Sequence, residues 1–431
     1  MNKQKIITFS IYLLMTGLQI QAQSSVKQKA RQKERGLTDF PALTFASIPG
    51  APKLSKPILI RGTEQPVIAQ GNGIAAPAFY DWDGDGLKDL LVGEFGSGVE
   101  NGKEVGHFIR VYKNVGTEEK PEFTGQWDYA RPPFKMPGNG TPYSIDQFCC
   151  MGFTPQFIDL NNDELPDMIT GSYYGEVYWF PGSKEGFEQG NALDQQPSSD
   201  GVPRNEPEKN PGRKAHQYYW LYSSACFGDL TGDGLPDLVV GGLGGLRISK
   251  NVGTSTVPKF GMRELLLDVS GKPLKIHEYT EEELKRFESL RFLGYTPYVA
   301  GNEDCSPYVV DWDNDGVPDL LVTNSYVHKG LAVVDFFKGV KTGDDIRFQS
   351  PVALFTTNTG KAFPGMGPRV FVTDWNNDGM NDLLVGMDVP TRKGKYDANL
   401  AWTWAEDRNI LGPGKAPATG YVFVLLGSSG Q

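Results

Sequence analysis

The chain has 431 residues with 52 glycines, 30 prolines and 12% aromatic residues, and its formal net charge at pH 7 is −10. This composition is typical of many short strands joined by tight turns, and the length is sufficient for one large folded core. Because no basic stripe runs along the sequence, binding to nucleic acid or to an anionic membrane surface is not expected.

The first 22 residues have the pattern of a secretory signal. Lys3 and Lys5 precede an apolar run over residues 6–20, and a small residue suitable for cleavage follows at Ala22. The run is too short to span a membrane as a working helix. We therefore expect a protein that is secreted or periplasmic and not inserted in a membrane. Residues 23–45 are mostly polar and predict a flexible lead-in.

Five copies of one acidic nine-residue loop follow. Each copy has oxygen-bearing side chains at positions 1, 3, 5 and 9, and four copies have glycine at position 6. Simple Asp-rich and Gly-rich turns would not require a carboxylate at position 9 in all five copies. Position 12 holds Val or Thr, so the loops are not EF-hands. The copies are DWDGDGLKD (81–89), DLNNDELPD (159–167), DLTGDGLPD (229–237), DWDNDGVPD (311–319) and DWNNDGMND (374–382).

These loops predict cation sites. Calcium takes about six to eight oxygen ligands, and alternate residues of a tight loop can direct that many inward. We predict up to five structural Ca²⁺ ions. The expected ligands are Asp81, Asp83, Asp85, Asp89, Asp159, Asn161, Asp163, Asp167, Asp229, Thr231, Asp233, Asp237, Asp311, Asp313, Asp315, Asp319, Asp374, Asn376, Asp378 and Asp382.

The loops and their flanking strands resemble the FG-GAP (or VCBS) repeats of integrin-type β-propellers in secreted bacterial proteins. Phe227 and Gly228 keep the FG pair before the third loop, and VYKNVGT (111–117) and ISKNVGT (248–254) resemble third-strand ends of such repeats. The resemblance implies an all-β propeller over residues 46–431, in which each loop holds calcium between strands one and two. Glu164 departs from the pattern where glycine is expected.

Five copies predict five blades, with six or seven as alternatives if the long connections hide degenerate strands. In copies one and three we expect fourth strands at 121–123 and 258–260. The last copy ends with its third strand at 420–426, and residues 56–60 resemble a fourth strand. The N-terminal strand should therefore complete the last blade and close the ring, which removes exposed sheet edges. Residues 279–292 predict a helical insertion.

Four cysteines are few for an exported protein of this length. They are Cys149, Cys150, Cys226 and Cys305, and their spacing does not indicate a disulfide framework. Buried free thiols and a single bridge between blades are both compatible with the sequence.

A ligand face is expected opposite the loops, where chain segments entering strand one and joining strands two and three should gather. Aromatic rings beside carboxylates and amides suit sugar rings, although packing between blades explains the stretch HQYYWLY (216–222) equally well. Tyr143 and Glu94 are expected on this face. The expected ligand-binding residues are Tyr173, Tyr174, Tyr218, Tyr219, Trp220, Tyr222 and Tyr326.

Two functions remain open. The first is a noncatalytic, calcium-stabilised module that binds an extracellular glycan or protein partner. The second is a polysaccharide-active enzyme, either a lyase with a base and a cationic group or a glycoside hydrolase with paired carboxylates. The candidate catalytic residues are His216, His328, Arg369, Asp146, Glu303 and Asp304. The sequence favours binding over catalysis, and it does not indicate the oligomeric state.

Overall fold

The computed structural model describes the residues that build the repeated sheets. These are residues 42–69, 74–95, 98–100, 103–105, 107–145, 152–172, 175–193, 224–242, 245–276, 281, 305–324, 333–357, 366–389, 391–392, 395–396 and 420–429. The predicted signal (1–22) and the helical insertion (279–292), apart from Glu281, lie outside the described residues.

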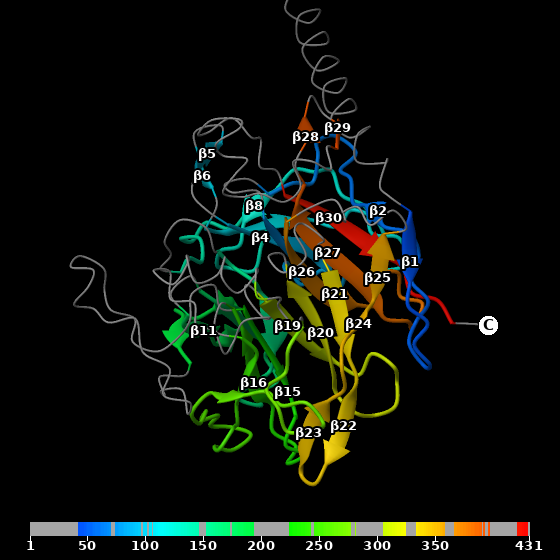
Figure 1. Cartoon of the computed structure of the whole chain (residues 1–431). Coiled ribbons are helices and arrows are strands. Elements are labelled where there is room, and N and C mark those ends of the chain that lie inside the picture. Colours follow the sequence, from blue (N-terminus) through cyan, green and yellow to red (C-terminus); the bar gives the residue numbers. More distant parts are fainter. Residues whose placement is uncertain are drawn as a thin grey trace, which may run out of the picture.

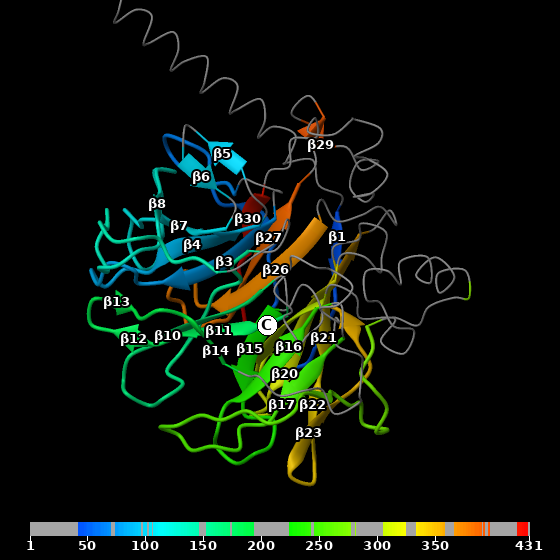
Figure 2. The same cartoon turned by 90° about the vertical axis from the view of Figure 1, so that its left-hand side faces the viewer.

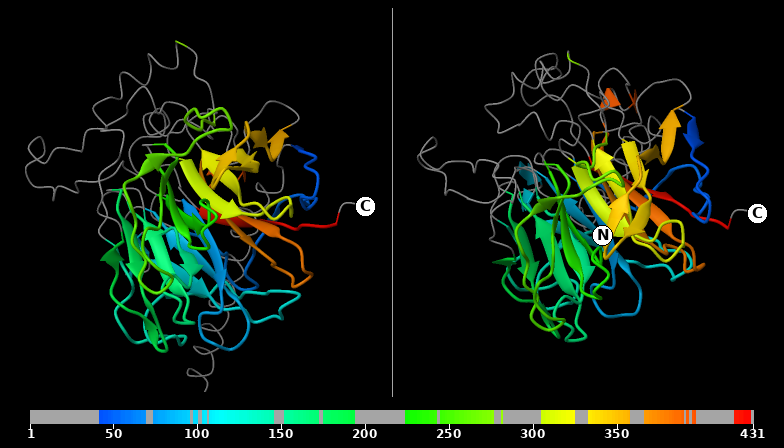
Figure 3. Two further views of the ribbon diagram at one scale, coloured as in Figure 1. Left: turned by 90° about the horizontal axis from the view of Figure 1, so that it is seen from below. Right: turned by 60° about the horizontal axis from the view of Figure 1, so that its bottom comes forward.

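Five four-stranded antiparallel sheets stand in a ring, which is a five-bladed β-propeller (Figures 1 and 3). Blade one contains β3 (Ala75–Tyr80), β4 (Asp89–Glu94), β7 (Ile109–Tyr112) and β8 (Asp128–Tyr129). Blade two contains β9 (Gln156–Ile158), β10 (Asp167–Gly171), β11 (Val177–Phe180) and β14 (Asn191–Ala192). Blade three contains β15 (Ser224–Gly228), β16 (Asp237–Gly241), β17 (Arg247–Ser249) and β18 (Glu264–Leu265). Blade four contains β19 (Cys305–Val310), β20 (Asp319–Asn324), β21 (Val333–Phe337) and β24 (Val352–Ala353). Blade five contains β26 (Met366–Thr373), β27 (Asp382–Asp388), β30 (Gly420–Leu425) and β2 (Ile58–Leu59).

Short two-stranded ribbons extend from the blades. They pair β1 (Leu43–Phe45) with β25 (Phe355–Thr357), β5 (Gly98–Glu100) with β6 (Lys103–Val105), β12 (Gly182–Ser183) with β13 (Gly186–Phe187), β22 (Gly339–Thr342) with β23 (Asp345–Phe348), and β28 (Thr391–Arg392) with β29 (Lys395–Tyr396).

The ring closes as predicted, because an N-terminal strand completes the last blade. Strand β2 pairs antiparallel with β30, with Leu59 opposite Phe423, and Figure 1 shows the two strands side by side. The preceding strand β1 pairs with β25, next to blade four. The segment 42–60 therefore joins the beginning of the chain to its last two blades.

The core lies between neighbouring blades. The second strand of each blade is a short apolar run without polar alternation, as expected for a strand buried on both faces, and β4 is buried throughout. The apolar residue two positions before each loop belongs to one of the core clusters or packs against it. Phe79 packs against Trp375 with ring centroids 4.5 Å apart, and strands β3 and β26 lie side by side in Figure 2.

Two predicted strands were misplaced. The fourth strands of blades one and three are β8 and β18. Phe123 forms isolated bridges to Asn114 and Gly62, and Phe260 forms one to Asn251. The reason is a side-chain hydrogen-bond pair. Asn114 Oδ1 accepts the backbone N–H groups of Gly116 (2.9 Å) and Glu122 (3.1 Å), which folds the segment back on the end of strand three. Asn251 makes the equivalent pair in blade three.

Two of the four thiols can be located. Cys226 and Cys305 are buried thiols outside any disulfide, whereas Cys149 and Cys150 lie outside the described residues. Within the described part of the chain, no helix is long and apolar enough to cross a membrane.

Candidate metal sites and the opposite face

All five acidic loops lie at one end of the ring, here called the loop face, because each loop joins strand one to strand two of its blade. The end of strand three reaches the same face in every blade. The opposite face is formed by the other ends of these strands, where Glu94 and Asp388 end β4 and β27.

Carboxylates at positions 1 and 5 organise each loop through backbone N–H groups. One oxygen of the position-1 carboxylate accepts the N–H of position 6 at 2.8–3.0 Å in all five loops. The position-5 Oδ1 accepts the N–H of position 7 at 2.9–3.0 Å. These bonds wrap the chain around the side chains of positions 1, 3 and 5.

Positions 4 and 6 both adopt left-handed backbone conformations. Position 6 is glycine in four loops, and Glu164 adopts the same conformation in the second loop with φ of 69°. Its N–H still donates to Asp159, so the departure from glycine leaves the loop geometry intact. The sequence interpretation missed position 4, which is either glycine or asparagine in every copy: Gly84, Asn162, Gly232, Asn314 and Asn377 all have positive φ. Asparagine is the side chain that tolerates this region best after glycine.

The position-9 carboxylate clamps its blade together. One oxygen accepts the N–H of position 2 at 2.8–3.2 Å. The other accepts the N–H of the second residue after strand three at 2.6–2.9 Å. All five side chains are fully buried. This clamp explains the repeated carboxylate without a metal ion, a reason that sequence reasoning did not find.

Burial also disfavours the charge of the position-9 groups. Desolvation, followed by repulsion from Asp83, raises the pKa of Asp89 to about 7 against the opposing effect of its backbone hydrogen bonds. Desolvation likewise raises the pKa of Asp319 to about 6. A cation beside these groups would favour their ionised form.

Position 3 provides the test of whether the loops fit calcium. Asp83, Asp313 and Asn376 each have a buried Oδ1 atom without a hydrogen-bond partner. A buried oxygen left unpaired in this way is costly unless a ligand satisfies it. In the first loop, carboxylate oxygens of Asp81, Asp83 and Asp89 lie within 4.8 Å of one another, and those of the first three aspartates do so in the fourth loop. The donor set therefore fits a hard cation.

Lysines approach two of these loops from the end of strand three. Lys113 Nζ contacts Asp83 Oδ2 and lies 2.9 Å from Asp85 Oδ2. Lys338 Nζ contacts Asp313 Oδ2 and lies 2.5 Å from Asp315 Oδ2. Both ion pairs raise the pKa of the lysine.

On the opposite face, the described residues are mostly buried rather than open to a ligand. Arg369 is 3% exposed, its Nη1 donates to the Pro368 carbonyl at 2.9 Å, and its guanidinium lies over the Phe95 ring. Glu94 is fully buried, with Oε1 2.5 Å from Arg110 Nε. Burial alone raises the pKa of Asp335, in β21, to about 7.

Tyr143 does not belong to the ligand face, which corrects our expectation. Its hydroxyl donates to the Phe187 carbonyl (3.1 Å) and accepts the Phe187 N–H (2.7 Å), and its ring packs edge-on against Trp82. It is a buried link between blades one and two.

The other face predictions cannot be placed. The catalytic candidates other than Arg369, and all seven expected ligand-binding aromatics, lie outside the described residues: Asp146, Tyr173, Tyr174, His216, Tyr218, Tyr219, Trp220, Tyr222, Glu303, Asp304, Tyr326 and His328.

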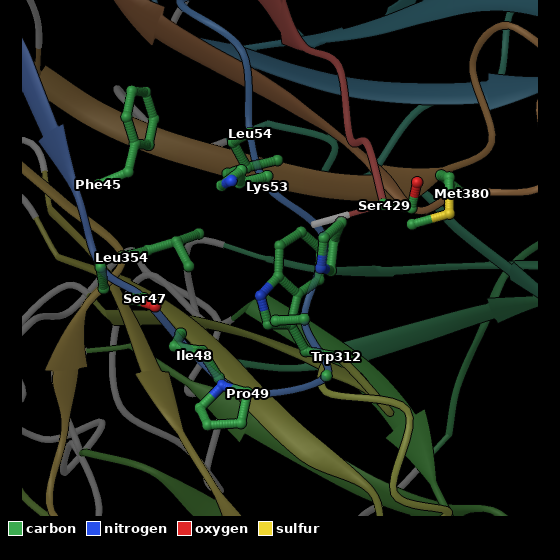
Figure 4. Close-up of a pocket in the computed structure, with 14 residues that line it drawn as sticks. Phe45, Ser47, Ile48, Pro49, Lys53, Leu54, Trp312, Leu354, Met380 and Ser429 are labelled. Carbon is green, nitrogen blue, oxygen red and sulfur yellow. The ribbon is translucent and has the colours of Figure 1, made fainter. Parts of the chain in front are cut away.

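A cavity of about 480 Å³ lies beside the loop face, between the segment 45–54 and blades four and five (Figure 4). Its lining combines apolar side chains, among them Phe45, Leu54 and Trp312, with the polar residues Ser47, Lys53 and Ser429. Trp312 Nε1 is buried without a hydrogen-bond partner among the described residues.

Comparisons with known proteins give distant likenesses. No family model and no curated protein match the chain. Among solved structures, the Tc holotoxin pore of Photorhabdus luminescens is 14% identical with a TM-score of 0.33, over 89% of this chain and 15% of that one. An Agrocybe aegerita lectin described as recognising non-reducing terminal N-acetylglucosamine is 16% identical with a TM-score of 0.34, over 82% and 71%. An endo-1,4-β-xylanase of Bacteroides thetaiotaomicron is 12% identical with a TM-score of 0.39, over 75% and 93%.

Proposed function

We propose that this chain is an exported, calcium-stabilised β-propeller of the FG-GAP type that binds an extracellular ligand, with glycans as the first class to test. The proposal rests on the chain's own residues. The observation that carries it is the buried, unpaired Oδ1 of Asn376, in a loop whose position-1 and position-5 carboxylates are already oriented by backbone N–H groups.

The loops would supply calcium with carboxylate and amide oxygens from positions 1, 3 and 5, beside the clamped carboxylate of position 9. Bound calcium would neutralise like charges that the fold brings together and hold the loop in one conformation. Extracellular calcium modules have Kd values of roughly 10⁻⁴ to 10⁻³ M, and an ion at ten times its Kd adds about 1.4 kcal/mol per site. The ions are therefore proposed as structural.

A noncatalytic role agrees best with the described part of the opposite face. Arg369 is the one described catalytic candidate, and its guanidinium is enclosed by Phe95 and the Pro368 carbonyl. The stretch HQYYWLY (216–222) remains the first place to look for a sugar-binding platform, because aromatic faces stack on the apolar face of sugar rings.

The calcium part is tested by thermal melting of the purified chain in EDTA and in millimolar Ca²⁺. We expect a rise in Tm of several degrees with calcium, because several sites stabilise one ring. Magnesium at the same concentration is the control, since it prefers six ligands in a tighter octahedron. An unchanged Tm with calcium would contradict structural metal loops.

The ligand part is tested by a glycan array on the calcium-loaded protein, followed by titration of any hit. Tyr218→Ala and Trp220→Ala should weaken binding at least about tenfold, as expected when a stacking aromatic is lost. Val257→Ala, at an exposed turn of blade three, is the matched control and should bind like the parent chain. Depolymerisation of a bound polysaccharide would instead make the protein an enzyme.

A further inference from the structure

We propose that the ammonium groups of Lys113 and Lys338 take the place of the metal ion in blades one and four, so that calcium binds only to loops of the other blades. This inference deepens the proposed calcium role and rests on it. It divides the five loops, which share one sequence motif, into two that hold a lysine ammonium group and others that can bind calcium.

The geometry of the two lysines supports substitution for a cation. Each lysine is the first residue after strand three, and each bridges the carboxylates of positions 3 and 5 across the mouth of its loop. Asp313 is 6% exposed, and its Oδ1 has no hydrogen-bond partner, so the positive charge of Lys338 compensates a carboxylate that solvent barely reaches. A buried carboxylate requires such a compensating charge.

Blades two and five differ from blades one and four both at position 3 of the loop and at the first residue after strand three. Position 3 is Asn161 or Asn376 instead of aspartate, and the first residue after strand three is Pro181 or Leu426 instead of lysine. There the asparagine amide donates directly to the position-5 carboxylate, at 2.9 Å in blade two and 3.0 Å in blade five. The position that carries the lysine in blades one and four therefore has no ammonium group in blades two and five.

The paired exchange keeps the charge equal at the ligand positions. Counting positions 1, 3, 5 and 9 with the first residue after strand three, four aspartates and one lysine leave −3 in blades one and four, and three aspartates leave −3 in blades two and five. An aspartate at position 3 thus accompanies a lysine in both cases. If all five loops bound calcium alike, the lysines would add a repulsive charge to two of them and serve no purpose.

Blade three shows that a lysine directly after strand three does not by itself place an ammonium group in the loop. Lys250 occupies the same position after strand three, but its Nζ lies 2.8 Å from Asp345 Oδ1 in the β22–β23 ribbon of blade four. Its loop has Thr231 at position 3, and that hydroxyl lies 3.2 Å from Asp237 Oδ2. The lysine enters the loop only where position 3 is aspartate.

The test counts bound calcium by native mass spectrometry and by equilibrium dialysis. We expect no more than three ions per parent chain, because two of the five loops hold lysine. The double variant Lys113→Met and Lys338→Met should bind two more ions than the parent, and each single variant one more. Lys250→Met is the matched control and should leave the number unchanged.

Thermal melting gives a second readout that does not depend on counting. The double variant should melt below the parent in EDTA, because the carboxylates of blades one and four lose their counter-ion, and calcium should raise its Tm more than it raises the parent's. Five ions on the parent, or an equal number on parent and double variant, would overturn the inference. Absence of calcium from the parent would refute the proposed function, whereas a gain of two ions in the double variant would still uphold this inference.

Discussion

At the scale of single residues, the position-9 aspartate is a structural group before it is a ligand. Its two oxygens join the loop to the end of strand three in every blade, and both accept backbone N–H groups in a fully buried place. Removing one acceptor there leaves a buried N–H donor without a partner, which lowers the free energy of unfolding by about 1–3 kcal/mol. The exposed position-5 carboxylate of blade five, Asp378, instead accepts hydrogen bonds from Asn376 and Met380 of its own loop.

Asp382→Asn should therefore destabilise the metal-free protein strongly. One of the two N–H groups, from Trp375 or Gly427, would face the amide nitrogen instead of an oxygen. We expect a loss of about 2 kcal/mol in the free energy of unfolding in EDTA. Asp378→Asn is the control and should cost much less in EDTA, because that side chain is exposed. Equal losses would refute the clamp. Chemical denaturation measures both.

Glu164→Gly should stabilise the protein. Glu164 holds φ of 69°, a region where a side chain with a Cβ is strained and glycine is not. We expect a gain of about 1 kcal/mol, read as a higher urea midpoint with an unchanged slope. Asn162→Gly, two positions earlier at φ of 54°, should gain less, because asparagine tolerates this region. A loss of stability in Glu164→Gly would contradict the strain.

The raised pKa of the buried Asp335 carboxyl predicts that the free energy of unfolding depends on pH. Burial raises the pKa of Asp335 from 3.8 to about 7 in the folded state. The folded state then holds the proton more tightly than the unfolded state, so this group's favourable contribution is complete below about pH 4. It is lost as the pH rises through about 7.

In Asp335→Asn this titration is absent. The variant should therefore gain stability relative to the parent between pH 4 and pH 8, by an amount on the order of 4 kcal/mol at most. Urea denaturation of both proteins across this range measures the difference. A difference that does not change with pH would show that Asp335 keeps an ordinary pKa.

At the scale of elements, strands with a strong pattern were predictable and short ones were not. The runs after each loop are apolar and bounded by aspartate and glycine, so β4, β16 and β27 were found at their positions. Strands β8 and β18 have two residues each and no pattern of their own. The more strand-like residues ending at Phe123 and Phe260 were chosen instead, because the hydrogen bonds of Asn114 and Asn251 cannot be seen as pairs in sequence.

The candidate site was predictable in its residues but not in its connections. The repeated spacing revealed the oxygen ligands of each loop, because they all lie within nine consecutive residues. The lysines were not found, although Lys113 lies within the quoted VYKNVGT phrase, because the contact of Lys113 with Asp83 joins residues 30 apart through strand pairing. Tyr143 was assigned to the wrong place because a tyrosine in a connection looks the same whether it reaches solvent or the Phe187 backbone.

The closing segment gives a prediction at this scale. A chain beginning at residue 62 lacks β1 and β2 and leaves the edge of β30 unpaired, and the parent for comparison begins at residue 42. We expect a lower Tm and light scattering that rises with concentration, because an open strand edge pairs with other chains. If the shorter chain melts like the longer one and stays monodisperse, strand β2 does not close the ring.

At the scale of the whole molecule, loops three, four and five contact other parts of the ring. Asn377 Nδ2 donates to Glu118 Oε2 of blade one at 3.0 Å, and Asn314 Nδ2 donates to the Gly50 carbonyl of the closing segment at 3.1 Å. The β22–β23 ribbon of blade four reaches the third loop through Ile346, whose N–H donates to the Leu230 carbonyl. A charge change in one loop therefore bears on the stability of the ring.

The loop face concentrates the acidity of the molecule. Its five loops contain 17 aspartates at the ligand positions, of the 52 acidic residues in the chain. Repulsion among exposed charges falls once their separation exceeds the Debye length, about 10 Å at 0.1 M salt and about 3 Å at 1 M.

In EDTA, raising the concentration of sodium chloride should therefore raise the Tm. With saturating calcium the same series should raise it less, because bound ions already neutralise the loops. Any general effect of salt on apolar burial acts on both series alike, so the difference between the two slopes isolates the loop charges. Parallel slopes would mean that loop repulsion contributes nothing to the stability of the ring, and calcium would then act through loop geometry alone.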